Sequence, residues 1–531
     1  MLLSDLSINL KEIVGILVII KFLQLVFKYN NRGYGTSERK DVFKDLPGWP
    51  LLGQLPEVVV NSRNLLEWAA KKQRKYGLGY SVTMPGLRVI EISRPDWIEH
   101  VQKTNFQNYV KGSLFQEVMS DVFGQGIFVT DGASWKSSRQ TTTRIFSATT
   151  FKTIITPSVH QTLNNLVEVL NEHSESGDIA ELDSLFHHFT LEAFVKMTFS
   201  QDMNCLRASN IGGEKDDSFE EAFDYVQQQL DLRFVFTAIW VRLGRFIANR
   251  PKMVSSIHIL EDYAYKLIDA RDTKSVESES PKDLLSLFKG FIDEKGVSMR
   301  RSELKDALLN LIIAGRDTTA QALSWCFFHL IRKPEHLDII RAEIENLLPC
   351  DESKVDYENY KDFTKTLAVF YEAVRLHPPV AKNAKFAVKH DKLPNGPLVE
   401  PGDCLRWSDW QMARDPDIWG NDCTEFLPSR WIDSDGKLKQ FGQWKFHAFN
   451  GGPRICIGMH LATLEAVTVL VELIRNFDFQ FERGWFEKVP KISKISPDST
   501  EITPRYASSL THPMAKPLRV IVHRRSKTST I

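Results

Sequence analysis

Residues 449–458 read FNGGPRICIG, and this short stretch decides the fold. It places Cys456 among three glycines, two residues after Arg454, whose charge is permanent. A hydrophobic core has little use for such a mixture, because glycine offers no side chain to pack. Glycines do allow tight turns and the close approach of a bulky, flat group. A cysteine thiolate can act there as a nucleophile, a redox centre or a metal ligand.

Three interpretations of Cys456 follow. A nucleophile would need a base, for which His447 and His460 are candidates. A metal ligand would benefit from bare peptide N–H groups, which tune a bound thiolate, and Arg454 would suit a carboxylate on the same bulky partner. A haem combines these needs, because it takes an axial ligand and carries two propionates. The third interpretation is a free cysteine buried in a glycine-rich turn.

Phe449, Gly452, Arg454, Cys456 and Gly458 match the pattern FxxGxRxCxG. The stretch therefore resembles the haem-binding loop of the cytochromes P450. The resemblance implies haem b (iron protoporphyrin IX), with the thiolate of Cys456 as the iron ligand. It also implies that the four other matched residues contact the haem, with Arg454 at a propionate.

A helical pattern runs from about Glu303 to Lys333, with Ser302 as its expected N-cap and a proline after its end. It is mostly apolar, so we expect it to be central. Its middle, residues 314–319, reads AGRDTT, and a carboxylate inside a buried helix is costly unless it is paired. Local rules are often broken in this way at functional sites.

The run AGRDTT resembles the oxygen-activating helix of the same family. The resemblance implies that Asp317 and Thr318 lie over the iron and relay protons, and that Gly315 leaves space for dioxygen. The alternative is a kinked helix in which Thr318 bonds to the backbone.

Further motifs occur in the order expected for the family. Glu372 and Arg375 resemble its ExxR pair, and Arg430 of the segment FLPSR would complete a buried structural network, although Ser429 replaces the usual glutamate. Trp135 and Arg139 resemble its WxxxR pair, which implies contacts with the haem propionates. Lys385 is implied to supply another propionate cation. Plain core packing is the alternative for Trp135.

The amino terminus contains an apolar run, IVGILVIIKFLQLVF at residues 13–27. It is short for a bilayer span, which needs about 20 residues. The cations that follow it would keep the rest of the chain on the cytoplasmic side. We therefore expect a membrane anchor over residues 1–30, a polar and proline-rich connector over residues 31–56 and a catalytic domain over residues 57–531. A buried helix is the alternative to the anchor.

Composition limits the class of protein. Lysine plus arginine (67) equals aspartate plus glutamate (67), so no basic surface for nucleic acid is expected. Six scattered cysteines favour a reducing compartment over a disulfide scaffold. Helical periodicity dominates, with a β-hairpin expected over residues 80–92 around Pro85 and Gly86. The expected fold is mainly α with a minor β part, which by resemblance is the cytochrome P450 fold.

The resemblance implies a haem-thiolate monooxygenase that uses O₂ and a lipophilic substrate. Electrons would come from NADPH through a separate NADPH–cytochrome P450 reductase, because we find no segment that fits a flavin-type fold. The runs AGRDTT and YEAVRLHPPV, with Asn383, resemble the fatty-acid and alkane ω-hydroxylase branch, and aromatic residues within 219–246 could line a channel. The expected location is the endoplasmic reticulum membrane, in contact with its lipid, with the catalytic domain facing the cytosol.

Three alternative functions stay open. The substrate could be a sterol or another lipid. A P450 that rearranges hydroperoxides would need neither O₂ nor a reductase, but it would also have no use for Asp317 and Thr318. A haem sensor or carrier would have no turnover.

Overall fold

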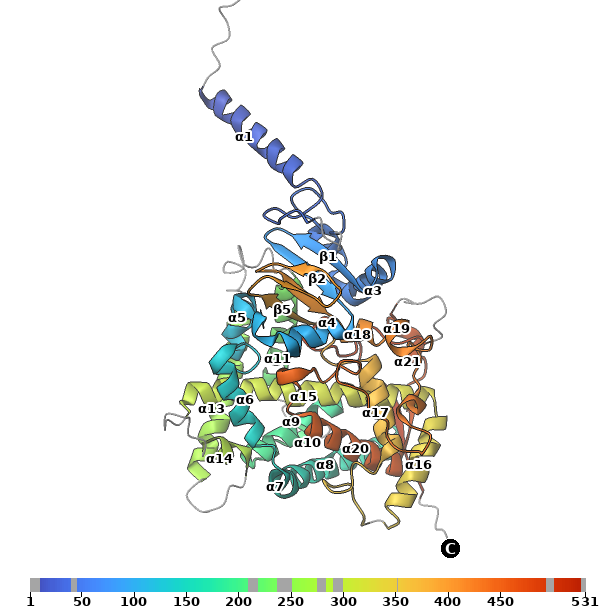
Figure 1. Cartoon of the computed structure of the whole chain (residues 1–531). Coiled ribbons are helices and arrows are strands. Elements are labelled where there is room, and N and C mark those ends of the chain that lie inside the picture. The colour runs from blue at the N-terminus through green and yellow to red at the C-terminus, as the bar shows by residue number, and fades with distance from the viewer. Residues whose placement is uncertain are drawn as a thin grey trace, which may run out of the picture. The chain divides into compact units, whose positions relative to one another are not determined.

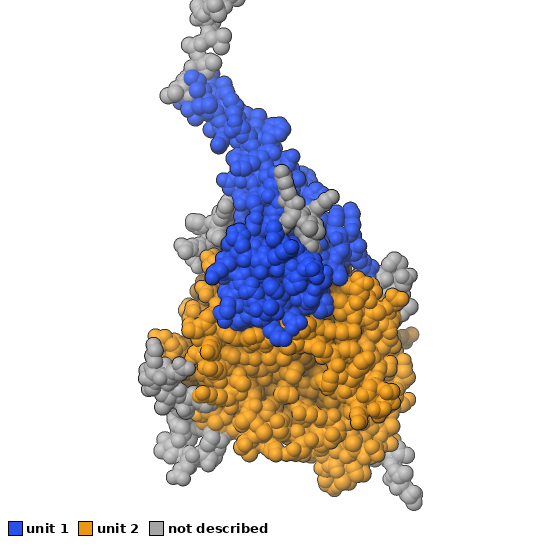
Figure 2. Space-filling view, in the orientation of Figure 1, with its two compact units in different colours: residues 1–110, 235–245, 384–407 blue, residues 111–234, 246–383, 408–531 orange. Residues whose placement is uncertain are grey.

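The computed structural model describes residues 10–39, 45–208, 218–235, 251–274, 283–289, 299–350, 352–492 and 501–526 (Figure 1). It divides into two compact units (Figure 2). Unit 1 contains residues 1–110, 235–245 and 384–407, and unit 2 contains residues 111–234, 246–383 and 408–531. The expected connector therefore belongs to unit 1, and the expected catalytic segment, residues 57–531, contributes to both units.

Unit 1 holds most of the β-structure. Its five-stranded sheet has the order β1-β2-β8-β5-β3. The predicted hairpin is confirmed, because Met84 of β1 pairs with Leu87 of β2 and leaves Pro85 and Gly86 as the turn, with φ 76° at Gly86. The elements of unit 1 are α1 (Leu10–Lys28), α2 (Leu55–Val60), η1 (Ser62–Asn64), α3 (Leu65–Tyr76), β1 (Gly79–Met84), β2 (Leu87–Ile92), α4 (Pro95–Glu99), η2 (His100–Thr104), η3 (Phe106–Asn108), β3 (Tyr109–Val110), β5 (Asn383–Ala387), β6 (Asp391–Lys392), β7 (Leu398–Val399) and β8 (Cys404–Trp407).

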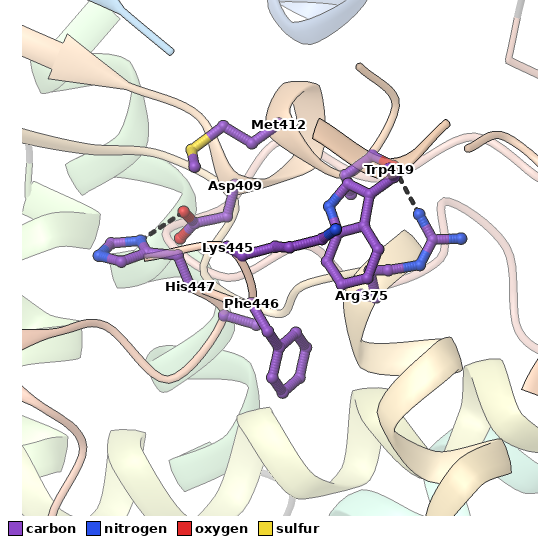
Figure 3. A pocket seen from close by; sticks show the side chains of 9 residues that line it. Arg375, Asp409, Met412, Trp419, Lys445, Phe446 and His447 are labelled. Carbon is purple, nitrogen blue, oxygen red and sulfur yellow. Dashed lines mark hydrogen bonds and ion pairs between the residues drawn. The ribbon is translucent and has the colours of Figure 1, made fainter. Parts of the chain in front are cut away.

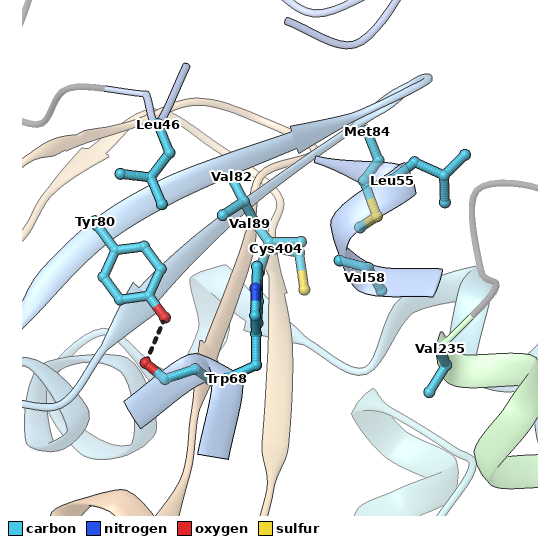
Figure 4. Packing of buried hydrophobic residues seen from close by; sticks show 11 residues of the cluster. Leu46, Leu55, Val58, Trp68, Tyr80, Val82, Met84, Val89, Val235 and Cys404 are labelled. Carbon is cyan, nitrogen blue, oxygen red and sulfur yellow. Dashed lines mark hydrogen bonds between the residues drawn. The ribbon is translucent and has the colours of Figure 1, made fainter. Parts of the chain in front are cut away.

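The predicted connector is folded onto this sheet. Leu46 and Leu55 are buried in the core cluster that also contains Trp68 and Tyr80 (Figure 4). The Tyr80 hydroxyl donates to the carbonyl of Ala69 over 3.2 Å, which ties the sheet to α3. Other apolar side chains of this segment, such as Trp49 and Leu52, are exposed, so only part of residues 31–56 packs into the core. The division into anchor, connector and catalytic segment stays a prediction.

The amino-terminal run forms α1, whose apolar side chains are largely exposed. The amide of Leu51 donates to the carbonyl of Tyr29 over 2.9 Å, so the end of α1 is bonded to the folded connector. None of the helices in the described ranges is long and apolar enough to cross a membrane. The structure thus shows a helix at the predicted position, and its role as an anchor stays a prediction.

Unit 2 is built around α15, which packs against α9, α17 and α20. A small sheet has the order β4-β10-β9. The elements of unit 2 are α5 (Gly112–Phe123), α6 (Gly132–Arg144), α7 (Ala148–Thr150), η4 (Phe151–Ile155), α8 (Thr156–Ser176), β4 (Ala180–Glu181), α9 (Leu182–Phe199), α10 (Cys205–Ala208), α11 (Ser218–Val235), α13 (Pro251–Lys274), α14 (Leu284–Lys289), α15 (Arg301–Arg332), α16 (Glu335–Leu347), α17 (Thr364–Leu376), α18 (Asp409–Met412), α19 (Pro416–Trp419), η6 (Pro428–Trp431), η7 (Gly452–Arg454), α20 (Met459–Asn476), β9 (Phe477–Phe481), α21 (Trp485–Lys488) and β10 (Arg519–Arg524).

The central helix confirms the predicted position of α15, but its N-cap is Arg300 rather than Ser302. The backbone amide of Arg300 donates to the Glu303 carboxylate over 2.9 Å, and this bond moves the start of the helix towards the N-terminus. Lys333 is the C-cap, directly before Pro334, which confirms the predicted end.

The predicted ExxR network is also present in unit 2. Arg375 donates to Glu372 through Nε and Nη2, over 2.7 and 2.8 Å. Arg430 Nε lies 3.5 Å from the same carboxylate, and the indole of Trp431 donates to it over 2.9 Å. Because Glu372 is fully buried, these donors are what make its charge tolerable.

Candidate active site

The segment around Cys456 is a tightly bonded loop before α20. The Cys456 amide donates to the Phe449 carbonyl over 2.8 Å, and the Gly452 amide donates to Gln443 Oε1 over 3.1 Å. Gly452 has φ 61°, a left-handed conformation that favours glycine. A Cβ on Gly451 would lie 2.3 Å from the ring of Trp444, so this position needs glycine for close approach.

Cys456 is an exposed residue of this loop. Burial raises the pKa of the Cys456 thiol, while a hydrogen bond from the Gly458 amide and the charge of Arg139 lower it. Gly458 is the N-cap of α20, so the positive end of a long helix points at the sulfur side of the loop. The amide and the positive charge thus support a thiolate against the larger, opposite effect of burial.

Neither candidate base is directed to the cysteine. His447 Nδ1 lies 2.6 Å from Asp409 Oδ1, and His460 Nδ1 lies 3.2 Å from the hydroxyl of Tyr360. The arrangement therefore gives no support to a cysteine–histidine nucleophile.

Cationic side chains gather beside the loop. Arg454 Nη2 donates to Asp131 over 2.7 Å and to the Thr130 carbonyl over 3.0 Å, and its guanidinium carbon lies 4.4 Å from the ring centre of Trp135. Burial, with a smaller effect of the charge of Arg139, lowers the pKa of Arg454 to about 10, although Asp131 acts in the opposite direction. Trp135 and Arg139, one turn apart on α6, thus lie close to Arg454, and their contact with haem propionates stays a prediction.

Lys111 was not predicted, because it stands in no recognisable motif. Burial and the charge of Arg454 lower its pKa to about 7, although Asp131 acts in the opposite direction. Asp131 is the N-cap of α6, and its position directly before the WxxxR helix was a signal that sequence reasoning could have used.

This donor set fits a haem. Lys111 and Arg454 both interact with the carboxylate of Asp131, and the charge of Arg139 acts on Arg454 as well. Arg454 Nε is buried and has no hydrogen-bond partner in the part of the chain that the structure describes. Two propionates would neutralise this excess of positive charge and satisfy such a donor.

On α15, Thr318 donates its hydroxyl to the carbonyl of Ala314 over 2.6 Å. This is the backbone-bonded geometry of the alternative interpretation, and it leaves the lone pairs of Oγ1 able to accept a proton donor. Gly315 faces α9, where a Cβ would lie 3.2 Å from Phe194 Cδ2. A larger residue here would press against Phe194, and the space for dioxygen at Gly315 stays a prediction.

Asp317 is buried in a polar network that links α11, α15 and the C-terminal segment. Gln227 Nε2 donates to Asp317 Oδ2 over 2.6 Å, Arg316 Nη1 donates to Oδ1 over 2.8 Å, and Thr511 Oγ1 lies 3.4 Å from Oδ2. Arg316 also pairs over 3.0 Å with Asp224, whose side chain is 56% exposed. The carboxylate is thus connected to the surface through Arg316, which the sequence did not reveal.

Two predictions are not settled by this geometry. Lys385 is buried on β5 in unit 1, and its assignment to a propionate stays a prediction. In the phenylalanine-rich stretch, Phe219 and Phe223 are core residues, with 5% and 1% of their surface exposed. Residues 236–246 of that stretch lie outside the described residues.

Comparisons with known proteins agree with the motifs. Residues 44–496 match the family model "Cytochrome P450". "Cytochrome P450 monooxygenase cyp1" of Mycosarcoma maydis is 40% identical over 518 residues, which cover 94% of this chain and 78% of that protein. "Cytochrome P450 86B1" of Arabidopsis thaliana is 30% identical, covering 84% of this chain and 83% of that protein. "Alkane hydroxylase MAH1" of the same plant is 28% identical, covering 84% and 90%.

The cysteine loop, the cation cluster and the buried Glu372–Arg375 pair thus occur in a chain most of which matches this family model. The chain belongs to the cytochrome P450 family and is a P450 monooxygenase.

Proposed function

We propose that this monooxygenase hydroxylates a fatty acid at or near its ω end. Its electrons come from NADPH through a separate NADPH–cytochrome P450 reductase. The observation that carries the proposal is the pairing of a haem-type cysteine loop with an acid–alcohol pair, Asp317 and Thr318, on the central helix. Its support for a long-chain substrate is the likeness to a relative named as an alkane hydroxylase.

One group of residues would bind the haem. Cys456 would hold the haem iron through its sulfur, and the Gly458 amide would support the negative charge on that sulfur. Arg454, Arg139 and Lys111 neutralise the propionates, with Trp135 stacked under the Arg454 guanidinium. When bound, the haem supplies the oxygen chemistry that breaks O–O and C–H bonds.

Asp317 and Thr318 on α15 would deliver protons. Thr318 Oγ1 would accept a hydrogen bond from the carboxyl group of Asp317 or from water and so position a proton at that atom. Asp317 is held by Arg316 and Gln227, so it must turn away from at least one of them to reach Thr318. Arg316 keeps its proton, so protons would reach Asp317 from solvent when the guanidinium pairs with the exposed Asp224 instead.

The test is a spectral titration of the haem-loaded protein with fatty acids of increasing chain length, the matching n-alkanes and a sterol. We expect the fatty acids to displace the iron's water and to be converted, with reductase and NADPH, to ω-hydroxylated products identified by mass spectrometry. A spectral shift with the sterol but with none of the fatty acids would contradict the proposal of a fatty-acid substrate. Turnover of a fatty-acid hydroperoxide without NADPH would instead support the rearranging alternative.

The proposed location is the endoplasmic reticulum membrane, with the enzyme body facing the cytosol. It rests on the exposed apolar surface of α1 and on Lys28 at its C-terminal end.

A further inference from the structure

A buried acid–histidine pair lies beside the cysteine loop. Asp409 Oδ1 and His447 Nδ1 are 2.6 Å apart, with 10% and 1% of their side chains exposed. Figure 3 shows the two side chains pointing toward one another in a small pocket. The same pocket is lined by Arg375, Met412, Ala413, Trp419, Lys445, Phe446 and Ala448.

His447 begins the turn that leads to the cysteine. The Asn450 amide donates to the His447 carbonyl over 2.7 Å, and Asn450 has φ 64°. Inside this turn, the Phe449 carbonyl accepts from the Cys456 amide over 2.8 Å. The His447 side chain therefore belongs to the same turn as Phe449, and the carbonyl of Phe449 holds the backbone of Cys456.

Asp409 belongs to a rigid part of unit 2. It is the first residue of α18, and the hydroxyl of the preceding Ser408 donates to the Ala381 carbonyl over 2.9 Å. At the other end of α18, the Ala413 carbonyl accepts from Arg375 Nη1 over 2.5 Å. Asp409 is thus fixed to the same framework as the buried Glu372–Arg375 network.

We propose that Asp409 and His447 are positioning residues that clamp the turn before the cysteine loop to α18 and so hold Cys456 in place for the haem iron. This inference rests on the assignment of Cys456 as the iron ligand. The sequence did not single out Asp409, and it offered His447 only as a base.

The electrostatics explain why the pair acts as a unit. Burial raises the pKa of Asp409, and His447 opposes that shift by its charge and its hydrogen bond. Removing His447 would leave a buried carboxylate without this donor, and removing Asp409 would leave the Nδ1 donor without this acceptor. Lys445 and Arg375, which also line the pocket, are engaged with Trp419 at 4.9 and 5.0 Å from its ring centre.

The test uses the haem-loaded protein and the absorption band of its reduced CO complex, which distinguishes a thiolate ligand from a displaced or protonated one. Asp409→Ala and His447→Ala should lose the thiolate-type band roughly tenfold faster than the unchanged protein, which corresponds to about 1.4 kcal/mol. Asp409→Asn and His447→Gln can keep one hydrogen bond, so they should recover much of the lifetime. If the pair acts as one clamp, the double alanine variant should decay no faster than either single variant.

The chain offers a matched control in unit 1, where His100 Nε2 lies 2.8 Å from Asp391 Oδ2. His100→Ala removes a similar acid–histidine pair that belongs to the other compact unit, and it should leave the lifetime of the thiolate-type band unchanged. The proposal is overturned if both alanine variants at the clamp keep the lifetime of the unchanged protein, or if His100→Ala shortens it equally. Substrate plays no part in this measurement, so a wrong substrate class cannot produce either outcome.

Discussion

Glu465 shows how a single residue adds a pH dependence to this protein. It is buried on α20, where Thr319 of α15 donates a hydrogen bond to its carboxyl group. Burial raises its pKa from 4.5 to about 8, so the folded protein keeps this proton at neutral pH while the unfolded chain releases it. The contribution of Glu465 to stability is therefore complete below pH 4.5 and is lost as the pH rises towards 8.

Glu465→Gln should remove this dependence, because the amide keeps an acceptor for Thr319 and cannot ionise. The unchanged protein should lose up to about 1.4 kcal/mol of unfolding free energy per pH unit across this range, relative to the variant. Denaturant unfolding at a series of pH values gives the difference. Parallel stability curves for the two proteins would show that Glu465 is already ionised in the folded state.

At the residue scale, the sequence predicted those site residues that belong to contiguous motifs. Cys456, Arg454, Trp135 and Arg139 stand in short patterns, and the structure brings the last three together around the loop. Lys111 could not be found in this way, because its role depends on an arginine far away in the chain.

At the element scale, the cysteine loop depends on the close contact between Gly451 and Trp444. Gly451→Ala should place a methyl group against the indole, so we expect a lower ratio of bound haem to protein and a fall of several degrees in the unfolding temperature. Gly442→Ala is the matched control, since a Cβ there would meet nothing within 4 Å. Equal haem content in the two variants would mean that the loop tolerates the methyl group.

The elements also show where sequence patterns stop being informative. The Pro85–Gly86 turn and the end of α15 at Pro334 were predictable, because proline and glycine act locally on the backbone. The burial of Leu46 was not, since it depends on a sheet formed later in the chain. The bond between Asp317 and Gln227 likewise joins residues separated by 90 positions.

At the scale of the whole molecule, α1 is the element whose role the fold does not explain. Its apolar side chains are exposed, and Tyr29 at its end is bonded to Leu51. A chain that starts at Tyr29 keeps this bond and loses the apolar helix. It should therefore move from the membrane pellet to the soluble fraction while retaining its haem, as measured by fractionation and absorption spectra. A truncated protein that still sediments with membranes would contradict the anchor.

The central claim is that Cys456 binds the haem iron through its sulfur. The most direct measurement compares the reduced CO complexes of the unchanged protein, Cys456→Ala and Cys350→Ala, the last changing an exposed cysteine outside the loop. We expect a thiolate-type absorption band in the unchanged protein and in Cys350→Ala, and none in Cys456→Ala. A thiolate-type band that persists in Cys456→Ala would contradict it.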